Sequence, residues 1–227
     1  YPLACNQLGR ILMVKGDLAG SAGWFREAIR EMPDYKTAYY NLGVVLAIAD
    51  RNGEAMESFN KALSLDPGYS SAYSMIAFLH GKAGRTREAI ENYKKAVKYS
   101  AMNIQAMCEL AWLLAVAPED SIRDGSEALK LARSACNSTG GASVRALDVL
   151  GAAYAENGMF EDAASCVENA LRLLDELRGA RNLTGVEGAN AGEARYATPD
   201  EEEGREGLKQ RLELYRQKKP FRQDGKN

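Results

Sequence analysis

The chain has 227 residues, of which 46% are hydrophobic and 26% are charged, and its formal net charge at pH 7 is −2. This length and apolar content are enough to bury a continuous core. The nearly neutral balance of charges argues against nucleic-acid binding, which requires a broad basic surface. No apolar run reaches the roughly 18 residues that span a bilayer, so we expect no direct membrane insertion by this segment.

A period of 34 residues runs through the chain from its start. The small residues Gly9, Gly43, Ala77 and Ala111 recur at this spacing, and aromatic and alanine positions repeat in the same register: Phe25, Phe59, Tyr93, Ala28, Ala62 and Ala96. Each period holds two stretches with apolar residues at helical spacing, which predicts a pair of amphipathic helices. One helical hairpin cannot bury its own apolar face, so the pairs are expected to stack on one another.

The predicted elements form five repeats and a C-terminal extension. The repeats lie at about 2–35, 36–69, 70–103, 104–143 and 144–177. Gly16, Gly84 and Gly158 fall where the first helix of a repeat must end, a position that favours a left-handed C-terminal cap. The fourth repeat contains about five additional residues, in which Pro118 stops the first helix. Either Asp124 or Ser126 is expected to cap the next helix.

The period fails after the fifth repeat. Residues 178–197 are rich in Gly, Ala and Asn without apolar periodicity, which predicts a flexible linker. Thr198-Pro199-Asp200-Glu201 then combines a capping box with a proline suited to the first helical turn. A stripe of Leu208, Leu212 and Tyr215 follows. We therefore expect a capping helix over 198–217, with residues 218–227 as a tail.

The layout of the repeats, with the pattern Leu-Gly, then Ala-x3-Phe, then Pro, resembles the tetratricopeptide repeat (TPR) over residues 1–177. The resemblance implies an all-α fold, a right-handed superhelical TPR α-solenoid ending in a capping helix. Residues 111–174 and the closing Leu-Glu-Leu-Tyr-Arg-x-x-x-Pro-Phe-Arg phrase are similar to a module near the C-terminal end of bacterial TPR arrays. Members of that family often form part of larger proteins, including membrane-embedded sugar transferases.

Residues with catalytic or metal-binding chemistry are few and isolated. The four cysteines contain no C-x-x-C pair, and Cys5 is expected to pack as a small apolar residue. The single histidine, His80, takes the position of Leu46 and is expected to belong to the core. We therefore predict no catalytic residue, no cofactor and no metal site. The cysteine pattern suits a reducing cytoplasm, although the sequence leaves the compartment unknown.

A ligand-binding surface can be carried over from the TPR family, in which the first helix of each repeat lines a concave groove. The residues that this resemblance implies are Asn6, Arg10, Tyr40, Asn41, Val44, Ile48, Met75, Phe78, Lys82, Glu109 and Trp112. Only Asn41 matches the carboxylate clamp with which some members bind chaperone C-termini, so that ligand is not expected. The mostly apolar set suits an extended or helical peptide with aliphatic anchors. The alternative is that Phe78 and Trp112 are covered by neighbouring helices or by the C-terminal helix.

Three functional hypotheses follow. The first is a non-catalytic interaction scaffold that binds a peptide or protein in the concave groove. The second is an accessory TPR segment of a larger multidomain enzyme, such as a membrane-embedded glycosyltransferase, whose active site lies outside this chain. This hypothesis is suggested by Tyr1, which is in phase with Tyr35 and Tyr69, as is typical of a piece cut at a repeat boundary. The third is self-association through the uncapped face of the first repeat.

Overall fold

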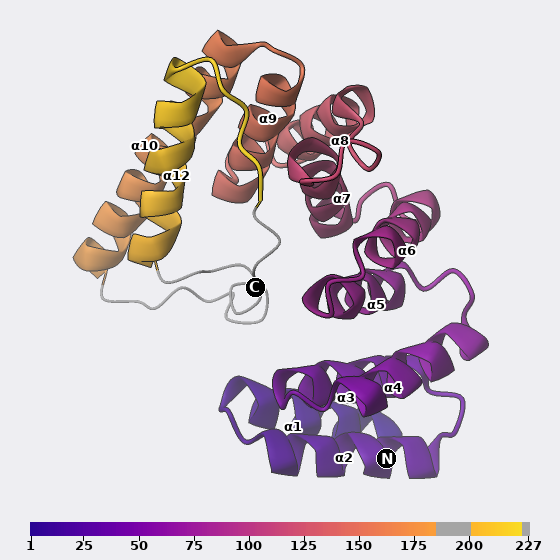
Figure 1. The fold of residues 1–227 in the computed structure, drawn as a ribbon. Helices are drawn as coiled ribbons and strands as arrows, with labels where there is room; N and C mark the ends of the chain where they lie inside the picture. Colours follow the sequence, from indigo (N-terminus) through magenta and orange to yellow (C-terminus); the bar gives the residue numbers. More distant parts are fainter. Residues whose placement is uncertain (185–200, 224–227) are drawn as a thin grey trace. The chain divides into compact units, whose positions relative to one another are not determined.

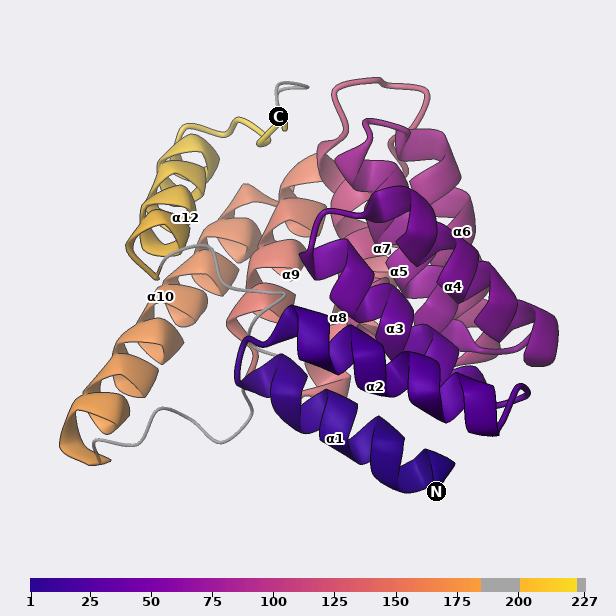
Figure 2. The same cartoon turned by 90° about the horizontal axis from the view of Figure 1, so that it is seen from below.

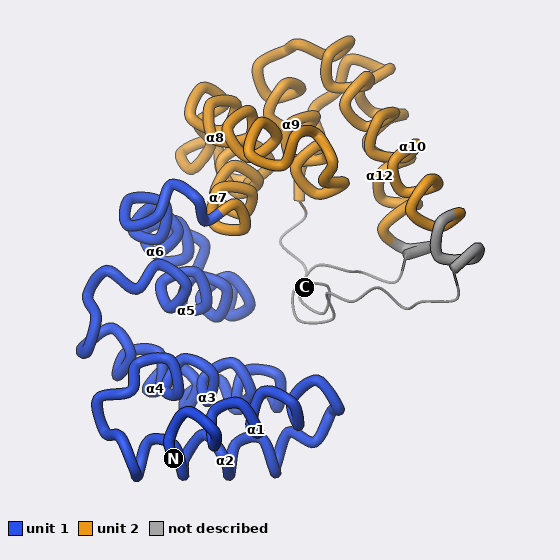
Figure 3. Tube along the Cα trace, turned by 180° about the vertical axis from the view of Figure 1, so that it is seen from behind, with its two compact units in different colours: residues 1–103 blue, residues 104–227 orange. Residues whose placement is uncertain are grey.

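The computed structural model describes residues 1–184 and 201–223, and all the regular secondary structure in these residues is α-helical (Figure 1). The expected all-α class is therefore confirmed. The chain divides into two compact units, residues 1–103 and residues 104–227 (Figure 3). Each unit is described by itself below.

Unit 1 consists of three helical hairpins. We call the first helix of each hairpin the A helix and the second the B helix. The A helices are α1 (Pro2–Val14), α3 (Lys36–Ile48) and α5 (Ser70–Lys82), and the B helices are α2 (Leu18–Glu31), α4 (Asn52–Leu65) and α6 (Thr86–Tyr99).

The turns inside these hairpins depend on left-handed residues. Gly16 and Gly84 have φ of 84° and 73°, as the sequence predicts, while Asp50 takes the same position in the second hairpin with φ of 58°. At the first turn, the Asp17 N–H donates to the Leu12 carbonyl at 3.0 Å, which satisfies a carbonyl at the end of α1. The Asp17 side chain then accepts from the Gly20 N–H at 2.9 Å and caps α2.

In the first two hairpins the core is an aromatic ring packed on a glycine, while the third hairpin has Ala77 and Tyr93 at the same positions. Phe25 and Phe59 are fully buried, and they fill the space left by the missing side chains of Gly9 and Gly43. A Cβ atom on either glycine would lie 2.6 Å from a ring carbon. The repeated glycine–aromatic pairs therefore hold the A and B helices close together.

Unit 2 contains α7 (Ile104–Val116), α8 (Gly125–Ser138), α9 (Val144–Glu156), α10 (Phe160–Thr184) and α12 (Glu201–Arg216). Of the two caps expected for α8, Asp124 is the one observed, and its Oδ1 accepts from the Glu127 N–H at 3.0 Å. Arg123 fixes the long α7–α8 connection, because it donates to the Ala117 carbonyl at 2.8 Å and to Glu156 at 2.9 Å.

The expected boundary between repeats and linker is corrected at one point. Helix α10 continues to Thr184, so residues 178–184, predicted to belong to the flexible linker, are helical. A single glycine such as Gly179 costs a helix only about 1 kcal/mol, and the arginines, alanine and leucine around it favour the helix. Residues 185–197 of the predicted linker, and Thr198 to Asp200 of the predicted capping box, lie outside the described residues.

Helix α12 packs along α10, as Figures 1 and 2 show. The expected stripe of Leu208, Leu212 and Tyr215 is buried, and it packs on a cluster that includes Ala163 and Val167. The outer face of α12 carries charged residues, so the helix covers the apolar side of α10 and presents a polar surface.

Candidate functional site

In unit 1 the predicted site residues lie on the A helices, and several of them are inaccessible. Asn6 and Asn41 are 4% and 9% exposed, and the Asn41 Nδ2 donates to the Asn6 Oδ1 at 2.9 Å, which joins α1 to α3. Val44 and Met75 are buried as well. These residues therefore hold neighbouring helices together and offer little surface to a ligand.

The remaining unit 1 residues are accessible. Ile48 at the end of α3 is 43% exposed, and Phe78 on α5 is 40% exposed. One turn after Phe78, the Lys82 Nζ lies 2.6 Å from Asp50, and this exposed ion pair connects the C-terminal ends of α5 and α3. Tyr40 is half-buried. We call Ile48, Phe78 and Lys82 the unit 1 surface.

Arg10 and Tyr40 contact other side chains of unit 1. Arg10 is exposed and donates to the Gln7 side chain at 3.1 Å. The ring of Tyr40 lies 5.3 Å from that of Tyr69 and 5.8 Å from that of Phe59. Tyr40 therefore extends the aromatic packing behind α3 and leaves the apolar contact area to Ile48 and Phe78.

In unit 2 the two predicted residues, Glu109 and Trp112, belong to a network of charges around an indole ring. The guanidinium groups of Arg145 and Arg211 lie 4.6 Å and 5.3 Å from the centre of the Trp112 ring, which is within cation–π range. Arg145 pairs with Glu109 at 3.1 Å. Burial opposes the charge of Arg145, but its neighbours Glu109 and Asp148 hold its pKa above the ordinary value.

The centre of this network is the buried carboxylate of Asp148, which is 5% exposed. Both of its oxygens accept hydrogen bonds from Arg211 on α12, at 2.7 Å and 2.9 Å. Two parallel bonds between a guanidinium and a carboxylate give both strength and a fixed orientation. The pair therefore fixes α12 relative to α9.

Residues 217–223, which we call the tail segment, cover Trp112. The Phe221 ring lies 5.8 Å from the indole, and the Trp112 Nε1 donates to the Gln223 Oε1 at 2.9 Å. The Gln223 N–H donates to the Val116 carbonyl at 3.0 Å, and Arg222 lies 2.7 Å from Glu156. The sequence offered a cover of Trp112 by neighbouring helices or by the C-terminal helix; Arg211 of α12 lies 5.3 Å from the indole centre, and the tail segment that follows α12 adds Phe221 and Gln223.

Sequence reasoning did not find the four residues of the C-terminal extension that make these contacts, namely Arg211, Phe221, Arg222 and Gln223. They lie outside the 34-residue period and are far in sequence from their partners. The available signal was the closing Leu-Glu-Leu-Tyr-Arg-x-x-x-Pro-Phe-Arg phrase, which contains Phe221 and Arg222.

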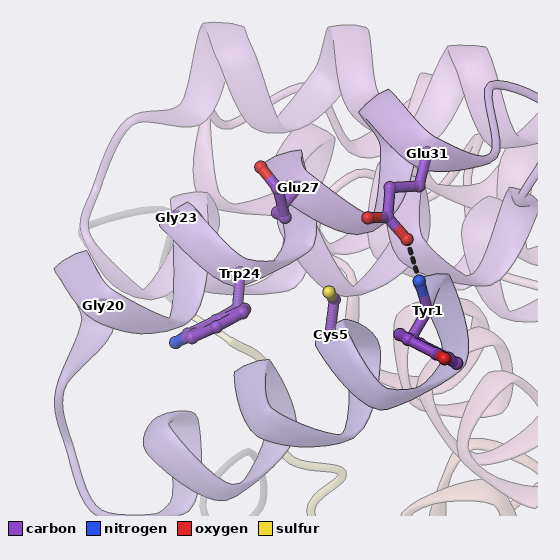
Figure 4. Close-up of a pocket in the computed structure, with 7 residues that line it drawn as sticks. All are labelled: Tyr1, Cys5, Gly20, Gly23, Trp24, Glu27 and Glu31. Carbon is purple, nitrogen blue, oxygen red and sulfur yellow. Dashed lines mark hydrogen bonds and ion pairs between the residues drawn. The ribbon is translucent and has the colours of Figure 1, made fainter.

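A shallow hollow of about 500 Å³ lies at the N-terminal face of unit 1, between α1 and α2 (Figure 4). Trp24, which is 39% exposed, and Cys5 supply apolar surface, and Glu27 and Glu31 supply acidic groups. Figure 4 shows Glu31 directed toward the amino group of Tyr1, with which it forms an ion pair. This is the face through which self-association was hypothesised.

The cysteine thiols and the histidine are buried or half-buried. Burial raises the pKa of the Cys108 thiol to about 12 and that of Cys166 to about 11, so both thiols are protonated at neutral pH. Burial, followed by the charge of Arg85, lowers the pKa of His80. In residues 1–184 and 201–223, no three His, Cys, Asp or Glu side chains are grouped as metal ligands. None of the helices described is both long and apolar enough to cross a membrane.

Comparisons with known proteins agree with this architecture. The sequence profile of the tetratricopeptide repeat matches residues 6–70, and a second tetratricopeptide repeat profile matches residues 70–101. No curated protein matches the sequence.

Solved structures resemble the fold at low sequence identity. A crystal structure of MamA protein is 18% identical, with a TM-score of 0.59 over 82% of this chain and 96% of that chain. MamA 41-end from Desulfovibrio magneticus RS-1 is 15% identical, with a TM-score of 0.60 over 77% and 96% of the two chains. YrrB, described as a TPR protein with an unusual peptide-binding site, is 19% identical, with a TM-score of 0.57 over 80% and 91%.

The helical hairpins, the glycine–aromatic pairs and the two profile matches define a repeat protein of the α-solenoid class. The chain contains tetratricopeptide repeats, which the family profiles place in residues 6–101. TPR folds mediate interactions between proteins and are typically non-catalytic.

Proposed function

We propose that this chain is a non-catalytic interaction module that binds a peptide or protein segment on its A helices, with the unit 1 surface as the centre of contact. The observation that carries the proposal is the exposure of Ile48 and Phe78, at 43% and 40%, on neighbouring A helices. Large apolar side chains left partly in water are the usual anchors of an interface.

The chemistry of the unit 1 surface favours an apolar anchor in the ligand. Asn6 and Asn41 already satisfy each other, and Lys82 is paired with Asp50, so new polar contacts would have to replace existing ones. Burying the exposed parts of Ile48 and Phe78 requires no such exchange. A ligand with an aliphatic or aromatic side chain is therefore favoured over a highly charged one. The peptide-binding site described for YrrB, a protein of similar fold, supports a peptide as the ligand.

The experiment is a binding measurement with peptides selected from a displayed random library against the intact chain. Replacing Ile48 and Phe78 together by Ala should weaken binding by at least about 2 kcal/mol, about thirtyfold in Kd. Met102→Ala is the matched control, because Met102 is an exposed apolar residue of unit 1 outside the A helices. Helical circular dichroism should be unchanged in both variants.

Two results would contradict the proposal. In one, the selected peptides bind the double variant as tightly as the original chain. In the other, Met102→Ala weakens binding as much as the double change, which would place the contact elsewhere on unit 1.

A further inference from the structure

The tail segment contacts unit 2 at the repeat positions from which the TPR resemblance places ligand contacts. Trp112 stands 34 residues after Phe78, and Glu109 stands 34 residues after Met75. In the fifth repeat, aligning Gly151 with Gly9 places Glu156 at the position of Ile48 and Lys82. Phe221 therefore packs on the unit 2 counterpart of Phe78, and Arg222 pairs with the counterpart of Lys82.

The contacts of the tail segment are those of a bound peptide. Phe221 provides an aromatic anchor against Trp112, and Arg222 provides a positive charge for Glu156. Gln223 is held twice, by its backbone N–H to the Val116 carbonyl and by its side chain to the Trp112 Nε1. Val116 is the last residue of α7, so its carbonyl has no partner further along the helix and is free to accept.

The tail segment is attached less firmly than the helix that precedes it. Leu208, Leu212 and Tyr215 anchor α12 with exposures of 3%, 8% and 1%. After them the chain turns at Lys218, a non-glycine residue with φ of 57°, and Phe221 to Gln223 are only half-buried. A left-handed backbone conformation costs a non-glycine residue about 1 kcal/mol or more. Lys218 adopts it at the point where the chain turns from α12 toward α7 and α9. Phe221 also packs against the apolar cluster that includes Leu208, Leu212 and Tyr215, and its ring centre lies 5.4 Å from the Arg211 guanidinium, so the tail segment contacts α12 but is less buried than it.

We infer that α7 and α9, the first helices of the fourth and fifth repeats, form a peptide site specific for an aromatic residue followed by arginine and glutamine, and that the chain's own tail segment fills it. A partner peptide with the same sequence of groups enters by displacing residues 221–223. Trp112 and Glu156 select the aromatic and basic side chains, and the Val116 carbonyl binds the main chain. The inference rests on the proposed function in placing peptide binding on A helices, and it names the ligand chemistry for unit 2.

The test uses the full chain with a changed tail. The probe is a labelled synthetic peptide with the sequence of residues 217–223, Gln-Lys-Lys-Pro-Phe-Arg-Gln. In the opened variant, Phe221→Ala and Arg222→Ala are combined, and the control variant combines Lys218→Ala with Lys219→Ala, two exposed positions. Fluorescence anisotropy of the peptide gives its Kd for each chain.

The opened variant should bind the peptide at least tenfold more tightly than the original chain, because a tethered tail competes at an effective concentration in the millimolar range. The control variant should bind as weakly as the original chain. A peptide with Ala in place of its Phe and Arg should not bind the opened variant.

Three results would overturn the inference. In the first, the folded opened variant binds no peptide, and in the second it binds with the Kd of the original chain. In the third, the opened variant loses its helical circular dichroism, which would show that the segment is part of the folded core and not a ligand. The proposed function is judged separately, since Ile48→Ala with Phe78→Ala must leave binding of this peptide to the opened variant unchanged.

Discussion

Replacing Gly43 by Ala tests the packing on which the hairpins depend. The added Cβ would lie 2.6, 2.8 and 2.9 Å from three ring carbons of Phe59. Carbon atoms in favourable contact are about 3.5–4.0 Å apart, so the ring or the helix must move by about 1 Å. Phe59 is fully buried, so its ring can move only against neighbouring side chains.

The expected size follows from two opposing effects. Overpacking a well-packed core costs about 1–3 kcal/mol. Replacing glycine by alanine inside a helix contributes about 1 kcal/mol in the opposite direction. Gly23→Ala isolates this second effect, because Gly23 lies inside α2 and a Cβ there meets nothing within 4 Å. The two variants should therefore differ by about 1–3 kcal/mol, with Gly43→Ala the less stable.

Urea unfolding followed by circular dichroism measures this difference. A double variant that combines Gly43→Ala with Phe59→Leu should recover part of the loss, since the smaller side chain makes room for the Cβ, and the coupling energy should be about 1 kcal/mol. If Gly43→Ala stabilises the chain as much as Gly23→Ala does, α3 and α4 do not pack as closely at Gly43 as the structure shows.

Three further predictions concern the core, a thiol and the charge network. Ala62→Leu should lower the free energy of unfolding by about 1–3 kcal/mol by overpacking, while Glu57→Ala on the outer face of α4 should stay within about 0.5 kcal/mol in the same urea titration; equal effects would show a wrong repeat register. With a pKa raised to about 12 by burial, Cys108 should resist a thiol reagent at pH 8 until the chain unfolds, and fast labelling of the folded protein would contradict its burial. Arg211→Met leaves the buried Asp148 carboxylate without its bidentate partner and should cost about 3 kcal/mol in urea unfolding, whereas a neutral result would show that the pair does not hold α12.

The repeats could be predicted from the sequence because their packing repeats along it. The small residue of each unit 1 A helix and the aromatic residue of the following B helix are a fixed number of residues apart, as Gly9 and Phe25 or Gly43 and Phe59 show. Turn glycines indicated the hairpin ends, as at Gly16, in the same way. The regular spacing of these residues was therefore sufficient to predict the helical hairpins.

The C-terminal part of the candidate site could not be predicted in this way. The Asp148–Arg211 pair joins residues 63 positions apart, and no periodic pattern relates them. The cover of Trp112 by Phe221 also depends on where α12 packs, which hydrophobic spacing alone does not decide. Likewise, the continuation of α10 through Gly179 depends on small differences in helix propensity that composition does not resolve.

Exposure of the side chains in a peptide complex tests the proposed binding surface most directly. Hydroxyl-radical footprinting of the chain, with and without a library-selected peptide, compares the oxidation of Phe78 with that of Trp24 in the N-terminal hollow and Met102 outside the A helices. All three side chains are at least 39% exposed in the free chain, so each can report protection. Our account expects the oxidation rate of Phe78 to fall at least severalfold on binding, while Trp24 and Met102 react as before. Protection of Trp24 with Phe78 still fully reactive would contradict it.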